Sequence, residues 1–324
     1  MEITMKTVQK LFFAIIIVVL ATCAGCGTQP SSVNSVGASL SFPMTVTDAL
    51  GNEISLSKQP VRIISLALTT DEILAAVADK SAIYGLSTYS DDKFYSNIVD
   101  FSATIPHKFT GKDLEKIIQA KPDLLLTSDW VDARDLARLR AVGIPVFTFK
   151  LPDTIDDIRK LIQTVGVLTG NNTRATGVIT ELNRRLKAVS TATETIPADN
   201  RLNAIMTDNL FYVFGTNALS AQLFTVANIN NLAAKMGVTN VDNVSKERIV
   251  AANPQAIFVS AYSAEENSNP LDIYLKDKSF ANVTAIKTNR VFVISSPHMT
   301  SASQFIALGA EDIARCAYPA AGIK

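Results

Sequence analysis

The sequence EKIIQAKPDLLL at residues 115–126 has a second copy, ERIVAANPQAIF, at residues 247–258. The copies share Glu, Ile, Ala and Pro at matching positions, and Lys/Arg and Ile/Val exchanges occupy two others. In each copy a short helical pattern is ended by a proline and followed by a continuous apolar run, which is typical of a buried strand. Because repetition of a unit indicates repetition of the architecture, we expect two related α/β lobes.

The sequence around the first copy alternates between strand and helix patterns. Alternating stretches at 42–48 and 53–56 flank the Gly51-Asn52 turn, which indicates a β-hairpin. A buried strand is expected at 62–66, and Thr69 and Glu72 have the spacing of a capping box that opens the next helix. The other elements expected in this half are helix 73–78, strand 82–86, helix 114–120, strand 124–126, helix 132–142 and strand 144–149. This order predicts a mainly parallel sheet with helices on both faces.

The α/β pattern resumes around the second copy. The elements expected there are strand 202–206, helix 220–236, helix 248–252, strand 257–259, strand 290–294 and helix 304–317. Parallel strands alternating with helices again predict a Rossmann-like lobe.

Two helices, expected at 155–168 and 172–189, separate the halves. The second has apolar residues at helical spacing, and at ~1.5 Å per residue it reaches about 30 Å, the diameter of a small lobe. A rigid spine between the lobes fits this length, and the alternative is an ordinary packing helix of one lobe. The predicted fold class is therefore α/β, with two Rossmann-like lobes of mainly parallel sheets joined by one long α-helix. The expected divisions are an N-terminal lobe at 42–153, a helical connector at 154–192 and a C-terminal lobe at 193–324.

The N-terminus has the pattern of a secretory signal. Lys6 and Lys10 precede an apolar run at 11–21, which is shorter than the ~20 residues that span a bilayer. Small residues before Cys26 resemble a bacterial lipobox, so we expect a signal peptide at 1–26 and lipidation of Cys26. Cys23 is the second choice, and a plain cleaved signal is the alternative. Residues 27–41 are expected to form a flexible tether.

The composition argues against several classes of function. The chain has 324 residues, with 30 Lys+Arg balancing 30 Asp+Glu, so no basic surface for nucleic acid is expected. The common nucleotide-binding, zinc-protease and serine-hydrolase motifs are absent, and only two histidines occur. We therefore expect a protein that is not an enzyme, and a catalyst using carboxylates alone is the alternative that the residues leave open.

The stretches at 42–51, 62–66, 70–74 and 88–91, together with the two repeat copies, resemble the periplasmic-binding proteins of ABC importers for iron–siderophore, haem and cobalamin. The resemblance extends from about residue 42 to Pro319 and implies a ligand held between two lobes joined by a single helix. It implies a monomer without a cofactor that works outside the cytoplasm, anchored to the bacterial membrane, with an ABC permease and ATPase complex as partner. It also implies that Glu115 and Glu247, one on each lobe, form ion pairs with permease arginines.

Ligands of parallel α/β lobes bind beyond the carboxyl ends of the strands. The loops expected there predict a cleft with aromatic and sulfur- or nitrogen-bearing side chains: Tyr89, Trp130, Tyr212, Tyr262, His298 and Met299. Phe211 and Tyr212 are adjacent on an extended segment, so they are expected to face opposite ways. Aromatic faces suit a large flat ligand, and His298 or Met299 are candidate ligands of its metal.

The cargo is expected to be a metal chelate, which is a ferric siderophore, a corrinoid or haem. These loops contain few arginines, which disfavours a strongly anionic siderophore. The alternatives are a receptor for a bare transition-metal ion, which two histidines disfavour, and a lipoprotein enzyme of the same architecture. A continuous spine helix predicts small movements of the lobes, because bending it would break backbone hydrogen bonds.

Overall fold

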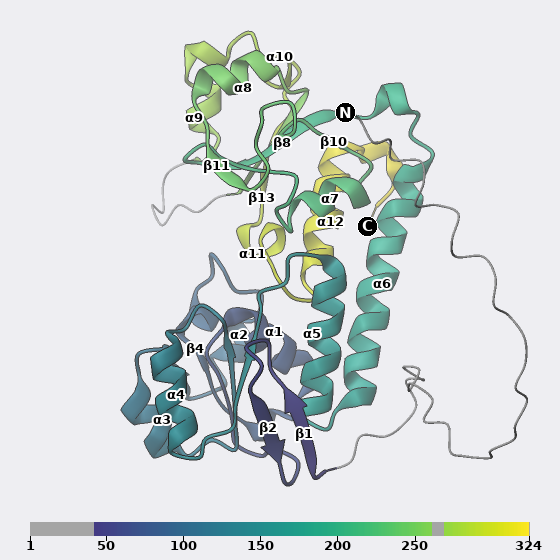
Figure 1. Cartoon of the computed structure of the whole chain (residues 1–324). Coiled ribbons are helices and arrows are strands. Elements are labelled where there is room, and N and C mark those ends of the chain that lie inside the picture. The colour runs from purple at the N-terminus through teal and green to yellow at the C-terminus, as the bar shows by residue number, and fades with distance from the viewer. Residues whose placement is uncertain (1–41, 261–268, 324) are drawn as a thin grey trace, which may run out of the picture. The chain divides into compact units, whose positions relative to one another are not determined.

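The computed structural model describes residues 42–260 and 269–323 (Figure 1). The predicted signal peptide, Cys23, Cys26, the tether at 27–41 and Tyr262 lie outside the described residues. The described residues all belong to one compact unit, Leu40–Lys324. No helix among the described residues is both long and apolar enough to cross a membrane.

The first sheet has five strands, all parallel, in the order β5-β4-β3-β6-β7. Its strands are β3 (Ile63–Ser65), β4 (Ile83–Ser87), β5 (His107–Phe109), β6 (Leu124–Ser128) and β7 (Val146–Phe149). The helices around it are α1 (Leu68–Val77), α2 (Val99–Ser102), α3 (Leu114–Ala120) and α4 (Ala133–Ala141). β5 is not among the strands expected from the sequence.

Successive residues of the central strand β6 enter different cores. Leu124 and Leu126 belong to the core that contains Ile73 of α1, whereas Leu125 belongs to the core that contains Leu136 of α4. Because side chains alternate between the faces of a strand, the sheet is covered by helices on both faces, as predicted.

The second sheet is mixed. Its main path is β11-β9-β8-β12-β13, with β10 beside the start of β8. Its strands are β8 (Asn203–Asp208), β9 (Tyr212–Phe214), β10 (Asn230–Asn231), β11 (Val241–Asn243), β12 (Ala256–Ser260) and β13 (Val291–Ile294). β8, β12 and β13 are parallel, whereas β9 runs antiparallel to both of its neighbours, β8 and β11; neither β9 nor β11 is among the expected strands. The helices here are α7 (Ala221–Val226), α8 (Lys246–Ala252), α9 (Asp272–Leu275), α10 (Thr284–Lys287), α11 (Ser296–Met299) and α12 (Ile306–Ala317).

The predicted helix at 220–236 is wrong. α7 ends at Val226, and Asn228 adopts a left-handed φ of 57°. The Asn228 side-chain amide donates to the carbonyl of Thr193, 2.9 Å away, which holds the turn. An asparagine tolerates this backbone conformation better than most residues, so the chain leaves the helix here and continues as β10.

The two repeat copies have the same local structure. α3 ends at Lys121 with φ 49° and α8 ends at Asn253 with φ 47°, and in each case a proline and then a central strand follow. In each copy, the residue after the proline forms a hydrogen bond with the backbone at the start of the neighbouring strand. The carboxylate of Asp123 accepts from the amide of Arg62 at 2.7 Å, and Gln255 Oε1 accepts from the amide of Asn203 at 2.8 Å. The sequence repeat is therefore a structural repeat as well.

Helices α5 (Ile155–Leu168) and α6 (Asn172–Glu194) connect the halves. α6 continues five residues beyond its predicted end and has 23 residues, or about 35 Å at ~1.5 Å per residue. It contacts α1 and α5 on one side and α7 and α12 on the other. One long helix therefore joins the two α/β lobes, as predicted.

The capping box predicted at Thr69 and Glu72 is wrong. α1 begins at Leu68, after Ala67, whose side chain makes no capping hydrogen bond. Thr70 lies inside the helix, where its hydroxyl donates to the carbonyl of Ala67 at 3.1 Å. Glu72 is buried and makes contacts distant in sequence, so it does not cap the helix.

The hairpin of β1 (Met44–Thr47) and β2 (Glu53–Leu56) is attached to the first lobe by a buried carboxylate. Asp48 accepts from the amides of Leu50 and Asn52 within the turn and from the amide of Thr148 in β7. Its second oxygen lies 2.8 Å from Nη2 of Arg140. Burial alone would raise the pKa of Asp48, but these hydrogen bonds outweigh it and lower the pKa.

We expect Asp48→Asn to lower the free energy of unfolding by about 2 kcal/mol at neutral pH, because the amide presents N–H groups to N–H donors. Since the folded pKa is lowered, the stabilisation is present above the ordinary pKa and disappears as the pH falls through the folded value. Urea denaturation at several pH values measures this difference. Glu181→Gln is the control, because it removes the charge of the exposed pair with Arg184 and should change little. An unchanged stability for Asp48→Asn at neutral pH would contradict the prediction.

Candidate ligand-binding cleft

A pocket of about 430 Å³ lies where the carboxyl ends of the two sheets meet. One wall is formed by Asp129 and Trp130 after β6 and by residues 150–153 after β7. The opposite wall is formed by Phe214 of β9, residues 218–220 before α7 and Val241 of β11. Thr300 and Ala302, which follow α11, complete the lining. The pocket therefore occupies the position where ligands of parallel α/β folds bind.

Trp130 is the most exposed large apolar residue among the described part of the chain, with 83% of its surface accessible. The loop that carries it is fixed by two backbone hydrogen bonds, from Asp129 N to the Phe149 carbonyl at 3.0 Å and from Val131 N to the Ser128 carbonyl at 3.3 Å. An exposed indole on a fixed loop beside a pocket is available to stack on a ligand. The loop position of Trp130 after a buried strand is as predicted, and its contact with a ligand stays a prediction.

The opposite wall depends on the antiparallel strands that sequence reasoning missed. Gly215 directly follows β9, and its amide donates to the carbonyl of Asn240 at 2.5 Å. A Cβ at position 215 would lie 2.2 Å from that oxygen, so only glycine permits this approach of the two chains. The approach places Phe214 and Val241 together in the pocket wall. In the sequence, a glycine after three apolar residues is the only local indication of this close approach.

The charged residues that line the pocket do not favour an anion. Lys150 Nζ lies 2.6 Å from the carboxylate of Asp153. The hydrogen bond that Lys150 donates to Asp153 and the charges of Asp153, Asp157 and Asp129 raise the pKa of Lys150, so this lysine stays protonated and paired. Among the described lining residues Lys150 is the only cation, and Asp129 and Asp153 outnumber it.

The other predicted cleft residues within the described part of the chain do not line this pocket. Tyr89 is 59% exposed in the turn at Thr88–Asp91, edge-on to Tyr95, and Tyr212 is 42% exposed at the start of β9. Phe211 packs inward against Tyr274 and Phe280, but its φ is 63°, so the extended backbone predicted for this residue is wrong.

His298 and Met299 both lie in α11. Nδ1 of His298 is 2.6 Å from Oδ2 of Asp312. Met299 is fully buried in the main hydrophobic core, away from any ligand surface. The described residues contain no group of three or more His, Cys, Asp or Glu side chains that could hold a metal ion.

Glu115 and Glu247 occupy matching positions in the structural repeat. Each is exposed in the first turn of its helix, α3 and α8 respectively. Hydrogen bonds from its own backbone N–H and from Ser245 lower the pKa of Glu247. A carboxylate near a helix N-terminus is electrostatically favourable, and both glutamates occupy such a position.

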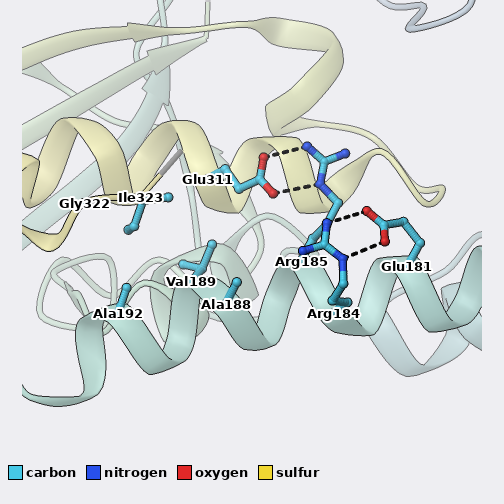
Figure 2. A pocket seen from close by; sticks show the side chains of 9 residues that line it. All are labelled: Glu181, Arg184, Arg185, Ala188, Val189, Ala192, Glu311, Gly322 and Ile323. Carbon is cyan, nitrogen blue, oxygen red and sulfur yellow. Dashed lines mark hydrogen bonds and ion pairs between the residues drawn. The ribbon is translucent and has the colours of Figure 1, made fainter.

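A larger pocket of about 520 Å³ lies between α6, α12 and the C-terminal residues (Figure 2). Its guanidinium groups are already paired: Arg185 with Glu311 at 2.6 and 2.7 Å, and Arg184 with Glu181 at 2.7 Å for both bonds. Figure 2 shows both carboxylates directed at the guanidinium groups rather than into the pocket. This pocket lies away from the strand ends and is therefore not the candidate site.

Two buried acids lie in α1, at the carboxyl edge of the first sheet. The Asp71 carboxylate accepts from the amide and hydroxyl of Ser87, at 3.2 and 2.5 Å. Burial raises the pKa of Asp71 from 3.8 to about 7, although its hydrogen bonds oppose the shift. Burial also raises the pKa of the neighbouring Glu72, against hydrogen bonds from Ser303, Asn97 and Ser301.

The comparisons with known proteins identify the class of protein. The family model for the periplasmic binding protein matches residues 63–297, which is most of the chain, so the chain belongs to that family. The family works outside the cytoplasm, and the relatives found are binding proteins rather than enzymes.

Particular relatives include the cobalamin-binding protein of Halobacterium salinarum. It is 26% identical over 292 residues, covering 88% of this chain and 77% of that protein. An uncharacterised ABC transporter substrate-binding lipoprotein of Bacillus subtilis, YvrC, is 24% identical over 323 residues, covering 95% and 96%. The fold matches that of MolA from Haemophilus influenzae bound to molybdate, with a TM-score of 0.71 at 18% identity over 86% of this chain and 92% of that one.

We expect the stability of the wild-type chain to fall relative to Asp71→Asn as the pH rises from about 5 to about 8. Because the folded pKa of Asp71 is raised to about 7, the native state binds more protons than the unfolded chain between these values. The stability linked to Asp71 is therefore present in acid and lost as the pH passes through 7. Melting temperatures of the two proteins at four pH values measure the difference. Parallel curves would show that Asp71 ionises normally.

Proposed function

We propose that this chain is the substrate-binding component of an ABC importer and that it captures a metal chelate between its lobes. The chelate classes are a corrinoid, haem or a ferric siderophore, and the pocket best supports a corrinoid. The observation that carries the proposal is the exposed Trp130 facing the wall of Phe214 and Val241 across a preformed pocket.

The pocket chemistry supports this order of cargoes. A flat ligand with apolar edges would stack on Trp130 and replace water on both walls. A strongly anionic siderophore would meet two carboxylates and a lysine that is already paired with one of them. The relative from Halobacterium salinarum is named for cobalamin binding, which agrees with the pocket. Tyr89, Tyr212, Tyr262 and His298 are proposed to contact the cargo where it projects from the pocket. Met299, which is buried, is left out of this surface.

The protein is proposed to act as a monomer in the extracytoplasmic space, held at the membrane by a lipid on Cys26, with Cys23 as the alternative. The Bacillus subtilis relative named as a lipoprotein supports the anchor. The proposed lobes comprise residues 42–153 and 193–324, with a connector at 154–192. A bare metal ion receptor and a lipoprotein enzyme are the alternatives, and no observation in the described residues favours either.

Titration of the purified chain with cyanocobalamin, dicyanocobinamide, haemin, ferrichrome and ferric enterobactin tests the cargo. We expect saturable quenching of Trp130 fluorescence by the corrinoids, after correction for their absorption, and no saturation by the trianionic ferric enterobactin. Trp130→Ala, followed by calorimetry, should weaken corrinoid binding about tenfold, because stacking of a ring contributes about 1–3 kcal/mol.

Leu50→Ala is the matched control, since Leu50 is an exposed apolar residue in the β1–β2 turn, away from the pocket. Its affinity should equal that of the wild type. Saturable binding of haemin or ferrichrome alone would replace the corrinoid by that cargo. Tight binding of ferric enterobactin would contradict the charge argument.

Glu115 and Glu247 are proposed to contact permease arginines, one from each lobe. Ionised carboxylates form strong, often bidentate hydrogen bonds with guanidinium groups, and two such contacts would orient both lobes on a partner.

The double variant Glu115→Arg/Glu247→Arg should abolish uptake of labelled cargo by cells or by the reconstituted importer, while leaving cargo affinity unchanged. Reversing both charges places like charges opposite each other, so the complex should dissociate. Asp199→Arg is the control, because Asp199 is exposed in the turn at Ala198–Asn200. Undiminished uptake by the double variant would remove these residues from the docking surface.

A further inference from the structure

Glu72 connects elements that are far apart in the sequence. Its side chain belongs to α1 in the first lobe, and the residue is only 2% exposed. One carboxylate oxygen accepts from the amide of Asn97 at 2.9 Å and from its Nδ2 at 2.8 Å. The other oxygen accepts from the hydroxyls of Ser301 at 3.1 Å and Ser303 at 2.5 Å, which precede α12. One carboxylate therefore joins the first lobe to a segment some 230 residues away.

Two further hydrogen bonds fix the ends of the same segment. Asn97 Nδ2 also donates to the carbonyl of Pro297 at 3.0 Å. Gln304 Nε2 donates to the backbone carbonyl of Glu72 at 2.7 Å. Residues 297–304 are thus held on the first lobe at both ends and in the middle, in addition to the connection that α6 provides.

Within residues 300–303, successive residues alternate between lining the candidate pocket and contacting Glu72. Thr300 and Ala302 line the candidate pocket, whereas Ser301 and Ser303 are buried against Glu72. The hydroxyls of Ser301 and Ser303 are also within 2.9 Å of each other. One face of a short segment therefore meets the ligand space while the other face rests on the buried carboxylate.

We infer that Glu72 is a positioning residue for the cargo pocket, holding residues 300–303 in place through Ser301 and Ser303. The inference rests on the proposed function in taking this pocket as the cargo site. A carboxylate suits the position because it accepts all four hydrogen bonds and has no N–H of its own. A glutamine would direct an amide N–H at existing donors, and an alanine would leave buried donors without partners.

The first experiment needs no cargo. Hydrogen–deuterium exchange of the purified chain is compared for wild type, Glu72→Ala and Glu72→Gln, with attention to residues 297–305. We expect exchange in this segment to rise at least tenfold in Glu72→Ala. Ser301→Ala/Ser303→Ala should reproduce the rise, because it removes the same two hydrogen bonds from the other side.

Asp71→Asn is the matched control. Asp71 is equally buried in the same turn of α1, but its side-chain hydrogen bonds go to Ser87 within the first lobe. This variant should change overall stability without raising exchange at 297–305. Unchanged exchange in folded Glu72→Gln and in the double serine variant would overturn the inference, as would an equal rise in Asp71→Asn.

The second experiment measures the affinity of the same variants for cyanocobalamin by calorimetry. We expect Glu72→Gln and the double serine variant to bind at least tenfold more weakly than Asp71→Asn. Loosened residues 297–305 with unchanged affinity would overturn the positioning role. Failure of the wild type to bind any corrinoid would overturn the proposed cargo instead, and the exchange experiment would still decide whether Glu72 holds the pocket wall.

Discussion

The apolar face of α6 is the interaction on which both lobes depend. Ala175, Leu182, Leu186 and Val189 are buried along one side of the helix, which contacts α1 and α5 of one lobe and α7 and α12 of the other. Burying each larger side chain contributes about 1.5–3 kcal/mol, and the backbone hydrogen bonds of a helix resist bending. The bidentate contact of Arg185 with Glu311 adds a polar connection between α6 and α12. The two lobes are therefore connected through one continuous helix that packs against both.

The pocket follows from this connection together with local backbone geometry. Parallel strands bring the loops after β6 and β7 to one edge of the first sheet, which places Trp130 beside residues 150–153. On the other side the close approach at Gly215 builds a wall from β9 and β11. Within the described lining the single lysine is paired with Asp153, and Asp129 adds a second carboxylate.

Glu72 places a buried polar network next to that pocket. Buried carboxylates are costly unless they are fully hydrogen-bonded, and this one accepts from four donors. The network is directional, unlike the apolar packing along α6, so it defines one arrangement of residues 300–303 relative to the first lobe. Apolar packing and hydrogen bonding therefore have different roles in this protein. The packing along α6 connects the lobes, and the hydrogen bonds of Glu72 position residues 300–303 beside the pocket.

Much of the fold was predictable because its signals are local. The bounds of α3 and α5 matched the expected helices, and the repeat around Glu115 and Glu247 had the same structure in both copies. The left-handed turn at Asn228, however, depends on a hydrogen bond to Thr193, and the antiparallel β9 and β11 depend on a backbone approach at Gly215. Of the predicted cleft residues that the structure describes, Trp130 alone lines the pocket, because it lies two residues after the end of β6 and its position is given by the strand end.

The sequence by itself determined the α/β alternation, the two related lobes, the long connecting helix and the edge at which Trp130 lies, because periodicity, proline stops and strand ends act over a few neighbouring residues. Only the tertiary structure decided which wall faces Trp130, that Met299 is core, and that Glu72 holds Ser301 and Ser303 instead of capping α1. Those outcomes join residues up to 231 positions apart. They depend on how the chain brings distant donors, acceptors and apolar surfaces together, and local sequence patterns do not encode such contacts.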